Sequence, residues 1–289
     1  MIPRFDSFAA LGPQGFSAIA YAEWGERDAA RTVVCVHGLT RNGRDFDMLA
    51  GSLAAAGYRV ATPDMPGRGA SDWLPSSEFY TYPFYLSAMA AFVARLGVRE
   101  VDWVGTSMGG IIGMMMAAQP GTPVRRLVLN DIGPFIPKAA LERLAGYVGL
   151  DPRFADIAGV EAYLRDVAAP FGPLSDDQWR HLAVHSAAPA SDGRLRLHYD
   201  PAIGAPFKTE PIADIDLWAQ WEKVACPVLV IRGAQSDLLL KATLDEMRTR
   251  GAAAARGLVQ TVEISGCGHA PALMAADQIA RVAEFLASA

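Results

Sequence analysis

The chain has 289 residues, of which 51% are hydrophobic and 20% charged, and its formal net charge is −5. This length suits one large α/β domain or a core domain with a sizeable insertion, and the composition excludes a disordered chain. The negative net charge excludes a basic field of the kind that holds a nucleic-acid backbone.

The chain opens with two weakly apolar strands in residues 5–24, interrupted by a turn at residues 12–15, which predicts an antiparallel hairpin at a sheet edge. From residue 32 onward, short β-branched runs alternate with helical patterns. The expected strands are 32–36, 58–62, 101–104 and 124–130, and the expected helices are 46–56, 84–96 and 107–119. Such alternation is typical of parallel strands joined by right-handed crossovers, with helices on both faces of the sheet.

The alternation stops after the sixth strand and resumes near residue 218. Strands are expected at 227–231 and 258–264, and helices at 240–250 and 272–287. The intervening residues contain helical stretches at 138–149, 160–168 and 176–187. Helices inserted between two parallel strands lie at the carboxyl edge of the sheet. We therefore predict a mostly parallel, eight-stranded α/β sheet with a core domain of residues 1–132 and 218–289 and a helical lid of residues 133–217.

The segment Gly105-Thr106-Ser107-Met108-Gly109 lies between an apolar strand and a helical run. A G-x-S-x-G sequence in this context is typical of a nucleophile elbow, a sharp turn that needs small residues two positions before and after the serine. Chance occurrence is the alternative, but the strand before and the helix after make it the lesser one. The pattern predicts that Ser107 is a nucleophile.

A serine nucleophile needs a base and a carboxylate that orients the base. Of five histidines, His269 lies in a glycine-flanked loop after the last strand, at the same sheet edge as the elbow, and is the expected base. Asp237 follows the penultimate strand, and the order Ser107, Asp237, His269 agrees with triads built on such an elbow. Asp131, directly after the sixth strand, is the rival acid or a residue that lines the pocket.

The negative charge that develops on a substrate oxygen needs preorganised hydrogen-bond donors. The backbone amide of Met108, directly after the nucleophile, is one expected donor. The amide of Leu39 is the other, because Gly38 lets the loop after strand 32–36 turn into the site.

His181 and His185 stand four residues apart in a predicted lid helix, a spacing that can bind zinc. No third ligand is evident near them in the sequence. We therefore interpret the two histidines as ordinary residues of a lid helix whose two faces differ in polarity, rather than as a zinc site. The expected chemistry requires neither a metal nor a cofactor.

Over nearly its whole length the chain resembles the α/β-hydrolase superfamily. The resemblance is carried by residues 37–40, residues 63–72, the elbow with Gly110 behind it, Arg232-Gly233 leading to Asp237, and residues 266–269. Within the superfamily it looks like the lidded bacterial hydrolases, which include esterases, enol-lactonases and meta-cleavage C–C hydrolases. Residues 39–43 lack the longer glycine-rich stretch of many C–C hydrolases. Serine at position 107 argues against haloalkane dehalogenases and epoxide hydrolases, whose nucleophile is a carboxylate.

The sequence therefore predicts a serine hydrolase that cleaves a carboxylic ester of a small to medium apolar substrate through an acyl-enzyme. An enol-lactonase, a C–C hydrolase or a perhydrolase would use the same triad, and a ligand-binding protein on this scaffold is the alternative from another class. The first residues lack a signal-peptide pattern, and no charge-free apolar stretch reaches membrane-spanning length. We expect a cytoplasmic protein with a small-molecule ester substrate and no nucleic-acid or membrane partner; the oligomeric state is left open.

Overall fold

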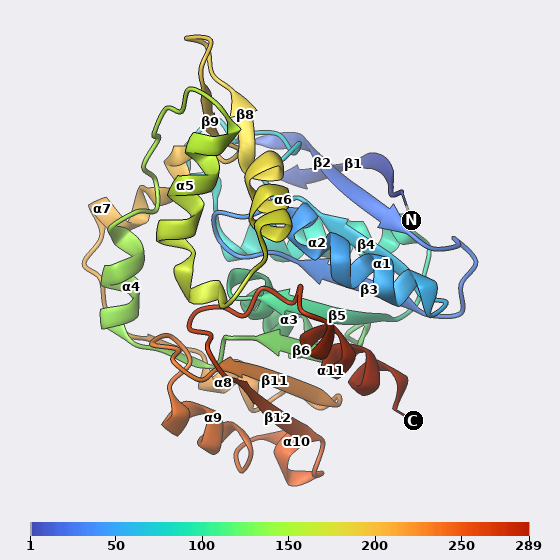
Figure 1. Cartoon of the computed structure of the whole chain (residues 1–289). Coiled ribbons are helices and arrows are strands. Elements are labelled where there is room, and N and C mark those ends of the chain that lie inside the picture. The colour runs from blue at the N-terminus through green and yellow to red at the C-terminus, as the bar shows by residue number, and fades with distance from the viewer. Residues whose placement is uncertain (1, 289) are drawn as a thin grey trace.

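The computed structural model describes residues 2–288 and is built around one eight-stranded sheet (Figure 1). The strand order is β1-β2-β4-β3-β5-β6-β11-β12. The strands are β1 (Arg4–Gly12), β2 (Gly15–Trp24), β3 (Thr32–Val36), β4 (Arg59–Pro63), β5 (Val101–Thr106), β6 (Val124–Asn130), β11 (Val228–Gly233) and β12 (Val259–Ile264). From β4 to β12 all neighbouring strands pair in parallel, which confirms the predicted mostly parallel sheet.

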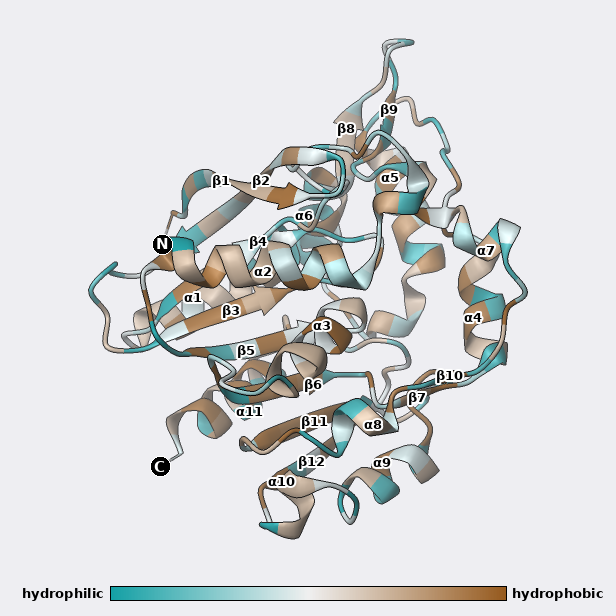
Figure 2. Ribbon diagram, turned by 180° about the vertical axis from the view of Figure 1, so that it is seen from behind, coloured by the Kyte–Doolittle hydropathy of each residue, from teal (hydrophilic) through white to brown (hydrophobic). Residues whose placement is uncertain are grey.

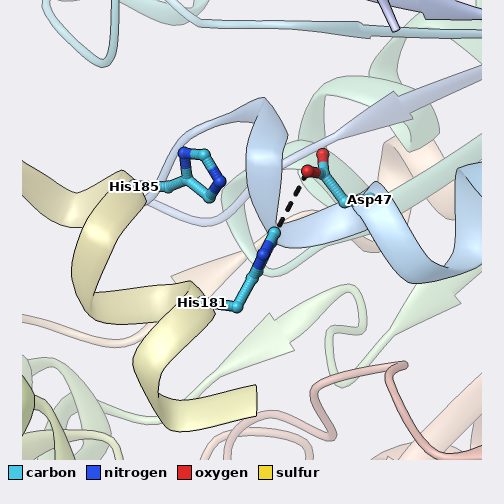
Figure 3. A group of neighbouring side chains, drawn as sticks. All are labelled: Asp47, His181 and His185. Carbon is cyan, nitrogen blue, oxygen red and sulfur yellow. Dashed lines mark ion pairs between the residues drawn. The ribbon is translucent and has the colours of Figure 1, made fainter. Parts of the chain in front are cut away.

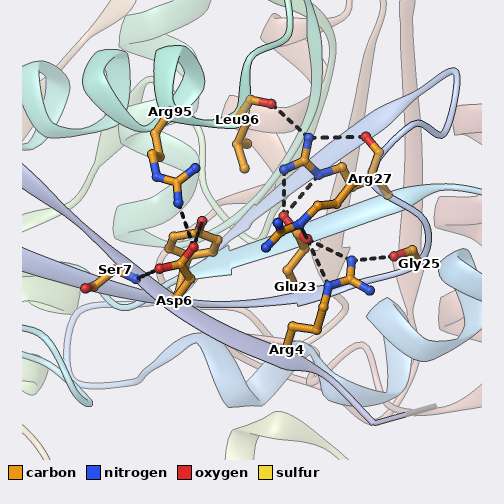
Figure 4. Close-up of polar contacts among 10 residues, drawn as sticks. Arg4, Asp6, Ser7, Glu23, Gly25, Arg27, Arg95 and Leu96 are labelled. Carbon is orange, nitrogen blue, oxygen red and sulfur yellow. Dashed lines mark hydrogen bonds and ion pairs between the residues drawn. The ribbon is translucent and has the colours of Figure 1, made fainter.

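The β1–β2 hairpin forms the antiparallel edge, as predicted, and β2 also pairs antiparallel with β4. A buried carboxylate, Glu23 at the end of β2, binds the guanidinium groups of Arg4, Arg27 and Arg59 (Figure 4). Burial alone would raise the pKa of Glu23, but the hydrogen bonds from the three arginines lower it to about 2. This cluster ties the edge hairpin to β4.

Helices cover both faces of the sheet because the central strands are apolar on both sides. Helices α1 (Asp47–Ala55) and α11 (Ala276–Ala287) pack on one face. The opposite face carries α2 (Tyr82–Leu96), α3 (Met108–Ala117), α8 (Trp218–Trp221), α9 (Lys241–Met247) and α10 (Ala252–Ala255). Figure 2 shows this second face, with hydrophobic colouring concentrated on the central strands. The predicted strands and helices of the sheet all form, and their ends shift by a few residues, with the last helix beginning four residues later than expected.

Between β6 and β11 lie residues 133–217, the segment predicted as a lid, which form helices and short strands beside the carboxyl ends of the parallel strands (Figure 1). This segment is called the insertion below. Its elements are β7 (Phe135–Ile136), α4 (Lys138–Ala145), α5 (Ile157–Val167), α6 (Asp176–Ser186), β8 (Ala187–Pro189), β9 (Leu195–Leu197), α7 (Pro206–Thr209) and β10 (Ile215–Asp216). Strands β7 and β10 pair where the chain leaves and re-enters the core. The insertion has its own apolar cluster, formed mainly by α5, α6 and β9.

Within residues 2–288, no helix combines the length and the apolarity that crossing a membrane requires.

Candidate active site

Ser107 lies in a strained turn between β5 and α3. Its φ of 52° and ψ of −117° fall outside the regions that L-residues favour, and such strain is typical of functional sites. Although Ser107 occupies the N-cap position of α3, its hydroxyl does not cap the helix. The hydroxyl instead lies 2.9 Å from Nε2 of His269.

The two glycines of the motif are required by close backbone contacts. A Cβ at Gly105 would lie 2.3 Å from the carbonyl oxygen of Gly109, and a Cβ at Gly109 would lie 2.0 Å from the carbonyl oxygen of Val36. Both distances are far below van der Waals contact, so a side chain at either position would push α3 away from the strands. The sequence rule for the elbow therefore has a direct steric cause in this chain.

His269, in the loop after β12, connects Ser107 to a buried carboxylate. Its Nδ1 lies 2.8 Å from Oδ2 of Asp131. A carboxylate can only accept a hydrogen bond, so Nδ1 carries the proton of the neutral imidazole and Nε2 is left to accept the proton of the Ser107 hydroxyl. The three side chains form one continuous chain of hydrogen bonds, which has the geometry of a nucleophile, a base and an orienting acid.

The carboxylate beside His269 is not that of Asp237, the acid that the sequence favoured, but that of Asp131. The Asp237 carboxylate is about half exposed and binds Arg143 of α4, with 2.9 Å between Nη2 and Oδ1, and makes no hydrogen bond to His269. Burial opposes the charge of Asp237, but the hydrogen bonds from Arg143 hold its pKa below the usual value. Asp131, the rival in the sequence, holds the position beside His269 because β6 lies between β5 and β11 and the end of β6 points into the site.

Asp131 is fixed by the neighbouring strand. It is fully buried, its Oδ1 accepts the Gly233 amide at 2.7 Å, and its Oδ2 also accepts the Ser236 hydroxyl at 2.6 Å. Sequence reasoning missed Ser236, the residue before Asp237. The penultimate strand thus contributes to the site through a hydroxyl and an amide rather than through a carboxylate.

The loop after β3 brings Leu39 next to the nucleophile. A Cβ at Gly38 would lie 3.7 Å from Cβ of Ser107, so the loop runs directly beside the elbow. Arg68 holds this loop by donating from Nε to the Leu39 carbonyl oxygen at 2.8 Å. Neither the Leu39 amide nor the Met108 amide donates a hydrogen bond to another residue within 2–288. Both amides are therefore available to a ligand.

His37 fixes the loop after β3 through hydrogen bonds of both ring nitrogens. Its Nδ1 lies 2.7 Å from the Gly38 carbonyl oxygen and its Nε2 accepts the Met65 amide at 2.9 Å. Complete burial lowers the pKa of His37 to about 3, so the ring is neutral with its proton on Nδ1. His37 thus fixes the turn and takes no part in the hydrogen-bond chain of Ser107.

Two cavities meet at Ser107. A larger one of about 400 Å³ is mostly apolar and runs past Met108, Ile132 and Leu238 of the core and Leu141 and Phe207 of the insertion. A smaller one of about 80 Å³ on the other side has more polar walls, which include Thr40, Arg41, Tyr147, Tyr163 and His198. The insertion thus supplies one wall of each cavity, and an elongated ligand could reach both sides of the serine.

The sequence and the fold are similar to those of known proteins. Residues 33–283 match the model of a family described as the alpha/beta hydrolase family. A 3-hydroxybutyrate-oligomer hydrolase from Cupriavidus necator is 44% identical over 295 residues, which cover 99% of each chain.

Two solved structures extend the similarity to the tertiary level. An alpha/beta hydrolase from Novosphingobium aromaticivorans has a TM-score of 0.85 at 30% identity and covers 99% of both chains. E-2-(acetamidomethylene)succinate hydrolase has a TM-score of 0.81 at 25% identity and covers 99% of this chain and 100% of its own. The alignments span the insertion as well as the core.

Proposed function

Because the chain belongs to the alpha/beta hydrolase family, we propose that it is a serine hydrolase that cleaves carboxylic esters through an acyl-enzyme on Ser107. The observation that carries this proposal is the hydrogen-bond chain from Ser107 through His269 to Asp131. The strained turn at Ser107 exposes the hydroxyl to a substrate, and the Leu39 and Met108 amides beside it are available as hydrogen-bond donors to the substrate oxygen.

In the first half of the reaction, Nε2 of His269 takes the hydroxyl proton as the Ser107 oxygen attacks the ester carbonyl carbon. The carbonyl oxygen becomes an oxyanion, which accepts hydrogen bonds from the amides of Met108 and Leu39. The Met108 amide also stands at the positive end of α3, which favours the negative charge. His269 then gives its proton to the leaving alcohol, and the acyl group remains on Ser107.

In the second half, a water molecule gives a proton to the same Nε2 and attacks the acyl carbon. The oxyanion forms again at the same two amides, and its collapse releases the acid and returns the proton to Ser107. Asp131 stabilises the imidazolium in both halves while Ser236 and Gly233 keep its carboxylate in place.

We propose that residues 133–217 act as a lid on a core of residues 1–132 and 218–289 and define the substrate. The lid contributes walls to both cavities, and the Arg143–Asp237 ion pair fastens its first helix to the core. An ester bond held at Ser107 would direct its two halves into cavities of different size and polarity.

The substrate class that fits best is a short ester of hydroxy acids. The similarity to the 3-hydroxybutyrate-oligomer hydrolase supports this choice. The smaller cavity, which has the more polar walls of the two, suits one hydroxyl-bearing unit, and the larger apolar cavity has room for further short units. Among the activities that share this triad, no feature of the site favours lactone or C–C cleavage over ester hydrolysis.

The proposal is tested with 3-hydroxybutyrate dimer and trimer beside a p-nitrophenyl ester series from acetate to octanoate. Wild type should cleave the oligomers to the monomer and prefer short acyl chains, and Ser107→Ala should be inactive on both. A fluorophosphonate should label wild type at Ser107 by mass spectrometry. Turnover that survives Ser107→Ala would refute the acyl-enzyme, and turnover of simple esters without oligomers would refute only the substrate class.

A further inference from the structure

The interface between the insertion and the core contains a cluster of three metal-ligating side chains, away from the catalytic residues. His181 and His185 project from one face of α6, and Asp47 is the first residue of α1 (Figure 3). One potential ligand atom from each residue lies within 4.8 Å of the other two. Asp47, more than 130 positions before the two histidines, is thus the third candidate ligand that was not evident near them in the sequence.

We propose that Asp47, His181 and His185 form a binding site for a divalent transition metal of the zinc class, which fastens the insertion to the core. Two imidazole nitrogens and one carboxylate oxygen are a donor set that suits zinc and leaves one position for water. The proposal does not depend on the ester-hydrolase assignment.

The spacing of the donors is close to that of a coordinated ion. Nε2 of His181 lies 3.6 Å from Oδ2 of Asp47. Metal–ligand bonds of ~2.0–2.1 Å in a tetrahedral arrangement place neighbouring ligand atoms about 3.3 Å apart. The His181 and His185 rings have centroids 4.5 Å apart at an interplanar angle of 65°, and one ring nitrogen of each lies within 4.8 Å of the other. All three residues are half-buried, which leaves a path for an ion from solvent.

Arg44 occupies part of this site without a metal. Its Nε donates to the two oxygens of Asp47 at 2.9 and 3.0 Å, and its carbonyl oxygen accepts a hydrogen bond from Nε2 of His181 at 3.0 Å. Nε2 of His181 must therefore release this proton before it can bind a metal. An incoming dication must displace this guanidinium, whose side chain is 23% exposed. Arg44 is therefore a competitor of the metal, and its removal should strengthen binding.

The site lies next to contacts that already join the insertion to the loop after β3. Asn42 donates from Nδ2 to the His185 carbonyl oxygen at 2.7 Å, and Arg41 donates from Nη1 to the Ser186 hydroxyl at 2.9 Å. A metal shared by α6 and α1 would reinforce this contact. Because the ion binds only the folded arrangement, it should raise the stability of the whole chain.

The test is titration of chelator-treated protein with Zn²⁺ by calorimetry and with Co²⁺ by visible absorption. Wild type should bind one ion per chain. His185→Ala and Asp47→Asn should weaken binding by at least about 100-fold, beyond the loss expected for a neighbouring hydrogen bond. Arg44→Ala should tighten binding several-fold, and His269→Ala should leave it unchanged, because the catalytic histidine is not a ligand.

Thermal unfolding gives a second readout. Zn²⁺ should raise the Tm of wild type and of Arg44→Ala and leave that of His185→Ala unchanged; His185→Gln replaces His185→Ala if the latter does not fold. Wild type that binds no Zn²⁺ up to about 1 mM would overturn the proposal. Binding that disappears in His269→Ala and persists in His185→Ala would overturn it as well, because the ion would then belong to the catalytic residues.

Discussion

Replacing Asp131 with Asn gives the sharpest test of the proposal that Asp131 is the acid that orients His269. In the wild type, Oδ1 of Asp131 accepts the Gly233 amide and Oδ2 faces both His269 and Ser236. The Asn oxygen must stay opposite the Gly233 amide, since an NH₂ group there would meet another donor. The NH₂ group therefore faces Nδ1 of His269 and forces the imidazole into the tautomer with its proton on Nε2. That nitrogen can no longer take the proton of Ser107.

The expected loss is large because the tautomer change removes the base and the lost charge removes stabilisation of the imidazolium. In the serine-protease template, the corresponding change lowers kcat by about 10⁴, which corresponds to ~5.5 kcal/mol of transition-state stabilisation. We expect a loss of about that size for Asp131→Asn. Asp237→Asn is the matched control: it removes one partly exposed ion pair, worth up to about 1 kcal/mol in stability, and should change kcat less than about threefold.

The assay compares kcat and kcat/KM on p-nitrophenyl butyrate for wild type, Asp131→Asn and Asp237→Asn, with circular dichroism and urea unfolding to show that each variant is folded. Rates are measured at several pH values, so that a shift in the base is separated from a loss of the base. A folded Asp131→Asn variant within about tenfold of wild type, or a loss confined to Asp237→Asn, would refute the assignment of the acid.

Three further predictions concern the elbow, the buried histidine and the edge hairpin. Gly109→Ala should abolish esterase activity, because its Cβ would lie 2.0 Å from the Val36 carbonyl oxygen; activity close to wild type would contradict the steric argument. Because the pKa of His37 is about 3 in the folded chain, its contribution to stability is complete above pH 6.5 and falls below that pH, where only the unfolded chain gains a proton. Urea unfolding should show a loss of about 2 kcal/mol from this histidine at pH 5 relative to pH 7, and equal stabilities at the two pH values would contradict the argument. Glu23→Gln should lower the free energy of unfolding by about 3–5 kcal/mol, because it leaves the buried Arg59 without its charged partner. In wild type, the contribution of Glu23 to stability should be complete above pH 4.5 and lost as pH falls through about 2; equal urea midpoints for wild type and Glu23→Gln would speak against both statements.

The sequence by itself determined the sheet and the part of the site that depends on local structure. A parallel strand followed by a helix gives a fixed turn at its carboxyl end, so the elbow motif was sufficient to place Ser107 between β5 and α3. His269 could be chosen because one histidine alone stands in the loop after the last strand. The order of strands and helices in the sheet also follows from patterns of period two and 3.6.

Only the tertiary structure decided which carboxylate faces His269. Asp131 and Asp237 both follow strands whose carboxyl ends meet at one edge, and spacing along the chain does not separate them. The choice rests on the direction of single side chains: the loop after β11 turns Ser236 inward and Asp237 outward to Arg143, which belongs to another part of the chain. The pairing of Asp47 with His181 and His185 has the same origin, because it depends on how the insertion packs on the core. Contacts between segments far apart in sequence depend on how the whole chain packs, so a local sequence pattern does not predict them.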